Sequence, residues 1–362
     1  MNFTNSNPQI KIAVIGVGLI GPRHCATVAK SPDAQLIAVV DPMPQGVKLA
    51  AKFGITPYSS IKDLLSSPHK PDGAIVCTPN NTHAALAIEL TLGGVHVLLE
   101  KPVAADLEGG QRLLQHSRQT KFQILVGHHR RFNPYIVVVK EALESRALGQ
   151  IIAINGLWTL FKPPEYFEAP TEWRKSKSGG VVLMNLIHEV DLLQYMFGQI
   201  TRIHAEKALS TRNHEAEEGA ALTLRFESGV VGSFLIADNL PSPHNFESGT
   251  GENPLIPQTG ENFYTIFGTD SSLSVPSMIR WSYDGVEKSW HVPLIPNNLD
   301  VPDGVPFELQ FSHFVQVCRG NENPKCTVGD GLSALIVCEA AKRAIFSGET
   351  VNIAEFAQAV YS

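Results

Sequence analysis

The feature that most constrains the fold is a regular alternation of short β-branched runs and helical patterns over residues 11–127. The runs are apolar throughout, as strands covered on both faces are. Thr82 and Asp106 stand where two of the intervening helices would begin. This rhythm predicts a doubly wound parallel sheet with helices on both faces. The expected strands are 11–15, 36–40, 74–77, 95–99 and 122–126.

After residue 150 strand-like segments follow one another closely, which predicts a second α/β domain with a large, mainly antiparallel open sheet. One strong helix is expected over 181–197. Two stretches, 161–180 and 238–262, are too long for ordinary connections, and their aromatic residues favour lids over a site rather than linkers. A last helix over 330–346 is expected to return to the first domain. The expected strands are 151–160, 200–209, 219–226, 230–237, 263–268 and 286–292.

Length and charge restrict the class of protein. A chain of 362 residues has the size of two domains, which we place at 1–127 with 311–362 and at 128–310. A net charge of −6 provides no basic surface for nucleic acid or an anionic membrane. The first ten residues lack a signal-peptide layout, and no apolar run approaches the roughly 18 residues of a membrane span. We therefore expect a cytoplasmic protein with a small-molecule partner.

The five cysteines form no CxxC pair and are odd in number. This pattern fits reduced thiols better than a disulfide framework or a zinc site, so no metal is expected.

The first expected strand runs into a GxGxxG motif, and a helix follows it. This motif alone is a weak signal, because a glycine-rich turn can also exist without a ligand. Here Asp41 ends the second expected strand about twenty residues later, as the dinucleotide fingerprint requires. The sequence therefore predicts a dinucleotide site, with the backbone of the motif at the pyrophosphate. The motif residues concerned are Gly16, Gly18, Leu19, Ile20 and Gly21.

Asp41 also bears on the choice of dinucleotide. Its carboxylate would accept hydrogen bonds from ribose hydroxyls and repel a 2′-phosphate, which favours NAD. Arg23 and Lys48 lie close enough in the sequence to soften that repulsion, so NADP stays possible. Because Pro42 follows it, Asp41 can also cap the next turn, and the two roles are compatible.

Two further polar segments stand at the carboxyl ends of expected strands, where open α/β sheets bind ligands. The first contains Thr78, Pro79 and Asn80, and the second contains Glu100 and Lys101. Lys101 is a candidate to stabilise an alkoxide, although composition alone fits a surface lysine equally well.

In this order the segments resemble the Gfo/Idh/MocA oxidoreductase family, named for glucose-fructose oxidoreductase and inositol dehydrogenase, over nearly the whole chain. The resemblance implies an N-terminal Rossmann domain and a C-terminal α/β domain whose sheet serves as an oligomer interface. It also implies NAD(P)-dependent oxidation of a secondary alcohol on a sugar, polyol or cyclitol. The resemblance rests on GVGLIG, TPNNTH, EKP at 100–102, VGHHRRFNP at 126–134, EWR at 172–174 and SGGVVLMNLIHEVDLLQYMFG at 178–198.

The resemblance places Lys101 and His188 on either side of the nicotinamide, and adds His83 to the cofactor-binding residues. Asn185 shares a helix face with His188 and is a candidate substrate contact. Many relatives carry an aspartate four residues before this histidine, where the present chain has Met184. The carboxylate that supports a general base is therefore missing, or an amide replaces it. Asp191, one turn after His188, could substitute for it, although its counterpart in the family is more often structural.

Three more residues are candidate substrate contacts. Arg131 belongs to a basic turn after the fifth expected strand, although such a turn can also be merely solvated. Trp173 and Arg174 lie in the first expected lid, where an aromatic face and a forked donor suit a polyhydroxylated ring.

We therefore expect an enzyme in which His188 removes a hydroxyl proton and Lys101 stabilises the negative charge that develops on that oxygen. An inositol-like or quinate-like substrate or an aldose fits best. An NAD-dependent glycosidase that oxidises transiently, or a non-catalytic transcriptional regulator that senses a dinucleotide, stays open as an alternative. We also expect a homodimer or homotetramer through the C-terminal sheet, because Val230, Val231, Phe234 and Ile236 make its strands apolar.

Overall fold

The computed structural model describes residues 8–361, and the chain forms two compact units. Residues 1–7 and Ser362 lie outside this range. The expectation that the first ten residues are not a signal peptide therefore falls mostly on residues outside it. Unit 1 runs to Phe132 and includes Pro306–Leu332, whereas unit 2 contains Asn133–Val305 and the chain from Ser333 onward. The expected return of all of 311–362 to the first domain therefore differs from the structure. The reason is that small residues after Ser333, such as Ala340, pack into the core of unit 2.

Unit 1 contains a six-stranded parallel sheet with the order β3-β2-β1-β4-β5-β6. All five strands expected from the sequence are present. Strand β3 was not predicted, since it has only three residues, none of them buried, and contains Pro57. The strands are β1 (Ile10–Ile15), β2 (Ala34–Val40), β3 (Thr56–Tyr58), β4 (Gly73–Val76), β5 (His96–Leu99) and β6 (Ile124–Val126).

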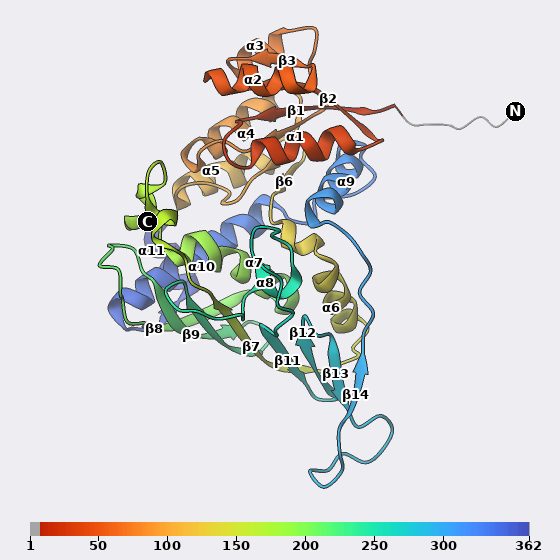
Figure 1. The fold of residues 1–362 in the computed structure, drawn as a ribbon, viewed down its shortest axis with the longest axis vertical. Coiled ribbons are helices and arrows are strands. Elements are labelled where there is room, and N and C mark those ends of the chain that lie inside the picture. The colour runs from red at the N-terminus through yellow and green to blue at the C-terminus, as the bar shows by residue number, and fades with distance from the viewer. Residues whose placement is uncertain (1–7, 362) are drawn as a thin grey trace, which may run out of the picture. The chain divides into compact units, whose positions relative to one another are not determined.

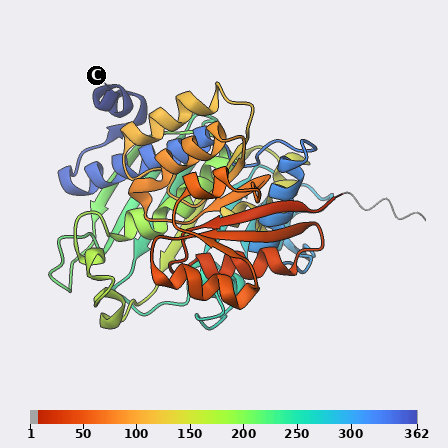
Figure 2. The same ribbon diagram turned by 90° about the horizontal axis from the view of Figure 1, so that it is seen from above.

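Helices cover both faces of this sheet, with α1 on one side and α4 and α5 on the other (Figure 2). Asp106 caps α5 as predicted, because its Oδ1 accepts from the Gly109 N–H over 2.7 Å. Thr82 directly precedes α4, but its hydroxyl donates to the Pro79 carbonyl instead of capping the helix. The elements are α1 (Gly21–Lys30), α2 (Pro44–Phe53), α3 (Ile61–Ser66), η1 (Asn80–Thr82), α4 (His83–Leu92), α5 (Leu107–Ser117), η2 (His129–Phe132) and α9 (Pro306–Cys318).

Unit 2 contains a nine-stranded mixed sheet with the order β14-β13-β12-β11-β7-β10-β9-β8-β15. Among the strands of this sheet that the structure describes, only β7 and β10 pair in parallel, so the prediction of a mainly antiparallel sheet is confirmed. The strand expected at 286–292 was wrong: this mostly exposed segment connects β13 and β14, which pair with each other. The strands are β7 (Ile151–Thr159), β8 (Ile200–Lys207), β9 (Gly219–Phe226), β10 (Val231–Ala237), β11 (Tyr264–Gly268), β12 (Ser271–Val275), β13 (Ile279–Ser282), β14 (Ile295–Asn298) and β15 (Val351–Asn352).

The helices α6, α7 and α10 lie on one face of this sheet and supply much of its core (Figure 1). The helix predicted over 181–197 begins with the π-helical turn η5 and continues as α7. Within residues 8–361 no helix is both long and apolar enough to cross a membrane. The elements are α6 (Pro134–Glu144), η3 (Pro164–Phe167), η4 (Glu172–Lys175), η5 (Val182–Leu186), α7 (Ile187–Phe197), α8 (Phe246–Thr250), α10 (Val328–Ser347) and α11 (Ile353–Tyr361).

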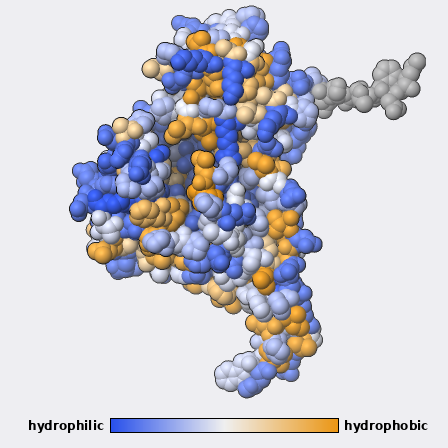
Figure 3. All heavy atoms as spheres, in the orientation of Figure 1, coloured by the Kyte–Doolittle hydropathy of each residue, from blue (hydrophilic) through white to orange (hydrophobic). Residues whose placement is uncertain are grey.

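The other face of this sheet carries exposed apolar side chains. Strand pairing sets Val231, Ala153, Phe267 and Trp281 in one row across the sheet, with Ser272 between the last two. Of these, Val231, Phe267 and Trp281 are exposed. In contrast, Val230, Phe234 and Ile236, which motivated the predicted interface, are buried in the core of unit 2. Further apolar surface surrounds the projecting β13–β14 connection (Figure 3), which contains the exposed residues Val286, Trp290 and Leu294 and leads to exposed Ile295 at the start of β14.

Candidate functional site

The glycine motif forms the turn between β1 and α1. Gly16 has a φ of +90°, and a Cβ there would lie 2.8 Å from Thr78 Cγ2 and 2.9 Å from the Cys77 carbonyl oxygen. A Cβ on Gly21 would lie 2.4 Å from the Gly16 carbonyl oxygen, so the turn needs both glycines. A Cβ on Gly18 would meet no atom within 4 Å outside its own neighbours. The loop is therefore closed on one side and open beside Gly18.

The start of α1 leaves backbone donors for a ligand. Ile20 occupies the N-cap position and makes no side-chain cap, and the Leu19 side chain is 87% exposed. The first N–H groups of a helix lack partners within the helix and favour an anion. A pyrophosphate therefore fits the residues of this turn, which is the arrangement that a bound dinucleotide requires.

Asp41 ends β2 and contacts the same turn. Its Oδ2 accepts from the Val17 N–H over 2.9 Å, and its Oδ1 accepts from the Met43 N–H over 2.8 Å. The carboxylate thus caps the turn after β2, as expected, and also fixes the glycine loop. Each oxygen keeps a further lone pair for a ribose hydroxyl, so the capping role leaves the predicted binding role intact.

The segment after β4 contains three predicted cofactor contacts, and Pro79 and Asn80 in it are exposed. Thr78 Oγ1 lies 2.6 Å from Thr82 Oγ1. The fourth predicted contact, His83, is only 1% exposed. Its Nδ1 lies 2.7 Å from the Pro102 carbonyl oxygen and its Nε2 lies 2.9 Å from the Thr78 carbonyl oxygen. His83 therefore joins the two predicted loops to each other.

Glu100 and Lys101 follow β5. Glu100 is buried, and its Oε1 lies 2.8 Å from Nε2 of His24 on α1. Burial alone would raise the pKa of Glu100, but the hydrogen bond from His24 and the nearby charges of His24, His129 and Lys101 lower it to about 2. The Oε2 atom accepts from the Lys101 N–H over 3.3 Å. An ionised carboxylate is thus fixed beside the backbone of Lys101.

Arg131 has a structural environment that the sequence did not predict. It is 3% exposed, its Nη1 donates to the Lys325 carbonyl over 2.7 Å, and it lies 3.8 Å from Asp330 Oδ2. These contacts hold the 325–330 segment within unit 1. A contact between Arg131 and substrate stays a prediction.

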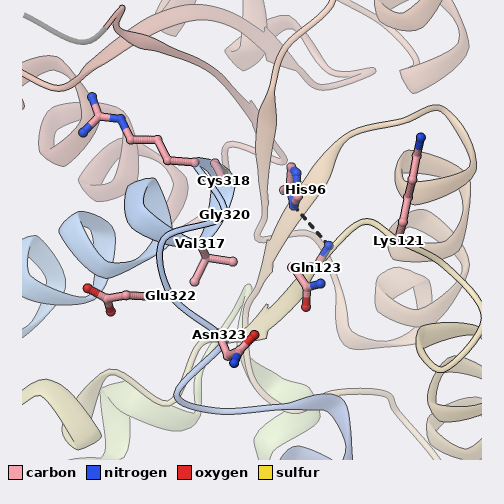
Figure 4. Close-up of a pocket in the computed structure, with 9 residues that line it drawn as sticks. His96, Lys121, Gln123, Val317, Cys318, Gly320, Glu322 and Asn323 are labelled. Atoms are coloured by element: carbon pink, nitrogen blue, oxygen red, sulfur yellow. Dashed lines mark hydrogen bonds between the residues drawn. The ribbon is translucent and has the colours of Figure 1, made fainter.

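A polar cavity of about 290 Å³ in unit 1 lies at the opposite edge of the parallel sheet (Figure 4). His96 begins β5 and Gln123 precedes β6, so the cavity lies at the amino ends of these strands. The Gln123 N–H donates to His96 Nδ1 over 3.1 Å, and burial lowers the pKa of His96. Because dinucleotides bind at the carboxyl ends, this cavity is separate from the cofactor edge.

In unit 2, the sequence did not reveal the partner of Asn185. Lys162 is 7% exposed, and its Nζ donates to Asn185 Oδ1 over 2.7 Å. The same ammonium lies 3.1 Å from Asp238 Oδ2. Burial lowers the pKa of Lys162, and the Asp238 carboxylate opposes that effect. Lys162 lies in the irregular 161–180 stretch, where no periodic pattern marks it.

A network of charged groups continues from Asp238. Its Oδ1 accepts from Arg212 Nη2, and Arg212 Nε lies 3.3 Å from Glu218 Oε2. Glu218 also accepts from the backbone N–H groups of Thr211 and Arg212, each over 2.9 Å. Burial would raise the pKa of Glu218, but these hydrogen bonds lower it to about 2. Asp238 therefore lies between two cations, Lys162 and Arg212.

The 161–180 stretch has an internal framework. Arg174 Nη1 donates to the Tyr166 carbonyl over 3.0 Å, and the guanidinium lies 3.9 Å from the centre of the Tyr166 ring. Trp173 is 47% exposed and its ring centre lies 5.9 Å from the same guanidinium. The two predicted substrate contacts are thus neighbours, and Trp173 presents an aromatic surface to solvent.

The helix that carries His188 begins at a buried carboxyl group. Glu217 Oε1 accepts from the Val182 N–H over 3.0 Å, and burial raises the pKa of Glu217. A Cβ on Gly180 would lie 2.0 Å from that oxygen, so the carboxyl group requires glycine there. His188 is 7% exposed and follows the π-helical turn, a feature frequent at functional sites. Met184, in place of the aspartate, is half-buried.

Two family models match the chain: an oxidoreductase family with an NAD-binding Rossmann fold over residues 10–128, and the C-terminal alpha/beta domain of that oxidoreductase family over residues 140–353. The chain belongs to the Gfo/Idh/MocA oxidoreductase family. Membership confirms the predicted family, the Rossmann domain and the α/β domain, and identifies NAD as the dinucleotide of the glycine loop.

Relatives of known name cover almost the whole chain. A myo-inositol 2-dehydrogenase of Thermotoga maritima is 27% identical over 96% of this chain and 99% of its own length. A scyllo-inositol 2-dehydrogenase (NAD(+)) of Bacillus subtilis is 25% identical over 95% of this chain and 96% of its own length. Neither relative is named as a glycosidase or a regulator. The predicted class, an NAD-dependent oxidoreductase, is confirmed.

A solved structure shows the same fold. It is described as a putative NADPH-dependent oxidoreductase of Desulfitobacterium hafniense, and it superposes with a TM-score of 0.82 at 19% identity. The match covers 97% of this chain and 99% of the other. Both units of the present chain thus have counterparts in one solved protein.

Within residues 8–361, no group of three or more histidine, cysteine or acidic side chains is arranged to hold a metal ion. Lys101 belongs to unit 1 and His188 to unit 2.

Proposed function

We propose that this Gfo/Idh/MocA oxidoreductase oxidises a secondary hydroxyl of a sugar, polyol or cyclitol, with an inositol-like or quinate-like substrate preferred. The observation that carries the proposal is the place of Lys101, at the carboxyl end of a strand in the NAD-binding sheet and beside a buried, ionised carboxylate. The two inositol 2-dehydrogenases that match along the whole chain support the substrate class.

The residues at the carboxyl edge of the unit 1 sheet hold the cofactor in this proposal. The backbone of Gly16 to Gly21, including Leu19 and Ile20, binds the pyrophosphate, and Asp41 binds the adenosine ribose. Thr78, Pro79 and Asn80 line the next part of the edge. When bound, NAD supplies the nicotinamide ring that accepts a hydride from the carbinol carbon.

Lys101 provides positive charge where negative charge develops. Its ammonium donates a hydrogen bond to the hydroxyl oxygen of the substrate and stabilises that oxygen as the proton leaves. Glu100 lies beside this lysine, since its Oε2 accepts from the Lys101 backbone N–H and its Oε1 lies 2.8 Å from His24 Nε2.

His188 takes the hydroxyl proton as the general base in this proposal. Asn185, three residues earlier on the same helix face, donates to a second substrate oxygen. Its amide orientation follows from Lys162, because an ammonium can only donate and so must face the amide oxygen. The Nδ2 group is then left as a donor for an oxygen of the substrate.

The lid residues Trp173 and Arg174 contact the substrate ring, with the indole against its apolar face and the guanidinium toward its hydroxyls. Arg131 is a further predicted contact, although its Nη1 already donates to Lys325. We further propose a homodimer or homotetramer that buries the exposed face of the nine-stranded sheet.

A turnover screen tests this function. Purified protein with NAD is given inositols, quinate, other polyols, aldoses and aryl glycosides, and NADH and released aglycone are measured together. We expect NADH from at least one cyclitol or polyol and no aglycone. Aglycone release without NADH would contradict the proposal and indicate transient oxidation, and turnover of no compound would contradict the substrate class.

A further inference from the structure

His83 contacts two carbonyl groups with its two ring nitrogens. It is the first residue of α4 and is 1% exposed. Its Nδ1 lies 2.7 Å from the carbonyl oxygen of Pro102, and its Nε2 lies 2.9 Å from the carbonyl oxygen of Thr78. Both distances are those of good hydrogen bonds.

This pairing determines the number of protons on the ring. A carbonyl oxygen can only accept, so each ring nitrogen must donate. A neutral imidazole has one N–H and one lone pair, and either tautomer would set that lone pair against a carbonyl lone pair. Only the imidazolium satisfies both contacts. We propose that His83 is held as an imidazolium that joins the Thr78 segment to the Pro102 segment and thereby positions Lys101.

The two loops that His83 joins are the ones on which the proposed site depends. The Thr78 segment packs directly against the glycine loop, since a Cβ on Gly16 would lie 2.9 Å from the Thr78 nitrogen. Pro102 directly follows Lys101. His83 therefore fixes the separation between the backbone that binds pyrophosphate and the lysine that contacts substrate. It acts through these two carbonyls, so it is a positioning residue.

The carboxylates around His83 do not supply the stabilisation of its positive charge. The carboxylates on elements packed against α4 have other partners: Asp63 on α3 accepts from Ser60, Glu108 on α5 lies 2.6 Å from Arg112, and Glu100 is bonded to His24. Glu89, on α4 itself, is exposed.

The cationic and titratable groups nearby do not favour the charge. The start of a helix disfavours a cation, and Lys101 adds a like charge next to Pro102. Lys62 on α3 and Arg112 on α5 are also cationic, whereas His96 has a lowered pKa, and His116 on α5 is bonded to the Thr91 hydroxyl. The two carbonyl oxygens are thus the groups that hold the second proton.

The protonation state can be measured without any substrate. The intact protein is labelled with ¹⁵N in its histidine rings, and the His83 signals are assigned from their loss in His83→Gln. At about pH 8, where a free imidazole is neutral, we expect both ring nitrogens of His83 to show an attached proton. A signal pattern of one N–H and one bare nitrogen would overturn the imidazolium.

The positioning role rests on the proposed function of Lys101 and has a separate test. In His83→Gln the single amide NH₂ group cannot span both carbonyls, so we expect kcat to fall roughly tenfold to a hundredfold. Dinucleotide Kd, measured by fluorescence, should change less than threefold, because the glycine loop and Asp41 remain. The matched control is His116→Gln, which removes another ring contact of unit 1, to the Thr91 hydroxyl, and should leave kcat unchanged.

The outcomes separate the two ideas. If His83→Gln turns over like the parent while Lys101→Ala does not, the positioning role is wrong and the function of Lys101 stands. If Lys101→Ala also turns over like the parent, the proposed function fails, and the NMR result still decides the charge of His83.

Discussion

The ammonium of Lys162 donates to Asn185 Oδ1 over 2.7 Å, three residues before His188 on the same helix. Asn185 adjoins Met184, the position where many relatives carry an aspartate. An amide fixed by a buried cation thus stands beside the position of a missing carboxylate. The group at this place offers hydrogen-bond donors to a substrate and carries no negative charge that would stabilise a protonated His188.

Replacement of Lys162 by methionine tests that relationship. The change frees the Asn185 amide and removes one of the two cations beside Asp238, while Arg212 remains. We expect the free energy of unfolding in urea to fall by about 1–3 kcal/mol, and substrate KM to rise. Lys140→Met, which removes an i,i+4 partner of Glu144 on α6, should change unfolding by less than about 0.5 kcal/mol. Unchanged stability and KM in Lys162→Met would show that the contact has no role.

Glu100 should make stability depend on acid pH. Its pKa is about 2 in the folded protein and 4.5 ordinarily, so the native state favours the ionised form. The resulting stabilisation, about 3 kcal/mol, is complete above pH 4.5 and is lost as pH falls toward 2. In Glu100→Gln this part of the acid dependence should disappear from urea unfolding measured at several pH values. Glu108→Gln on the exposed face of α5 is the control and should keep the parent slope.

Asp41 should determine the preference for NAD. Its carboxylate accepts from Val17 and Met43 and would oppose a 2′-phosphate, and no arginine directly follows it. We expect kcat/KM to be higher with NAD than with NADP, and Asp41→Ala to narrow the gap. A clear preference of the parent for NADP would remove this role from Asp41.

The exposed face of the nine-stranded sheet should form the oligomer contact. Val231 and Phe267 are each 42% exposed and belong to one cross-strand row. Charged side chains at both positions, as in Val231→Glu with Phe267→Glu, should shift light scattering from a dimer or tetramer to a monomer. Leu255→Glu, at an 89% exposed position outside the strands, should not. A parent protein that scatters as a 39.4 kDa monomer at micromolar concentration would contradict the prediction.

The elements of unit 1 could be predicted because local signals determine them. Buried β-branched runs produced all five expected strands, and the cap at Asp106 lies where the sequence placed it. The short strand β3 escaped prediction, since a three-residue strand with an internal proline has no periodic pattern. The order of β4 and β5 beside β1 then places Thr78 and Lys101 at the carboxyl edge of one sheet.

The contacts of unit 2 could not be predicted because they join residues far apart in the chain. Lys162 meets Asp238 across 76 positions, and Glu217 meets Val182 across 35. Lys162, Asp238 and Glu217 are residue types that usually lie at the surface, and no local pattern marks them as buried. The prediction of a strand at 286–292 was wrong for the opposite reason. The segment has a local pattern of apolar residues, but it is mostly exposed in the connection between β13 and β14.

Lys101 and His188 should separate catalysis from binding. Lys101→Ala removes charge stabilisation that is felt in the transition state, so we expect turnover to fall by about 10²- to 10³-fold while dinucleotide Kd survives. His188→Ala removes the general base and should lower turnover by roughly 10²- to 10⁴-fold. Because Met184 cannot stabilise an imidazolium, oxidation by the parent should rise with pH through the histidine titration and lose that step in His188→Ala.

Three measurements on each variant decide this last prediction: dinucleotide binding by fluorescence, turnover on the best substrate from the screen, and the pH–rate profile. Loss of turnover with intact binding assigns chemistry to the residue, whereas loss of both indicates a damaged fold. If both variants turn over like the parent, neither residue has its proposed role. The site must then be sought among Arg131, Trp173 and Arg174, of which Trp173 is the most exposed and the first to replace.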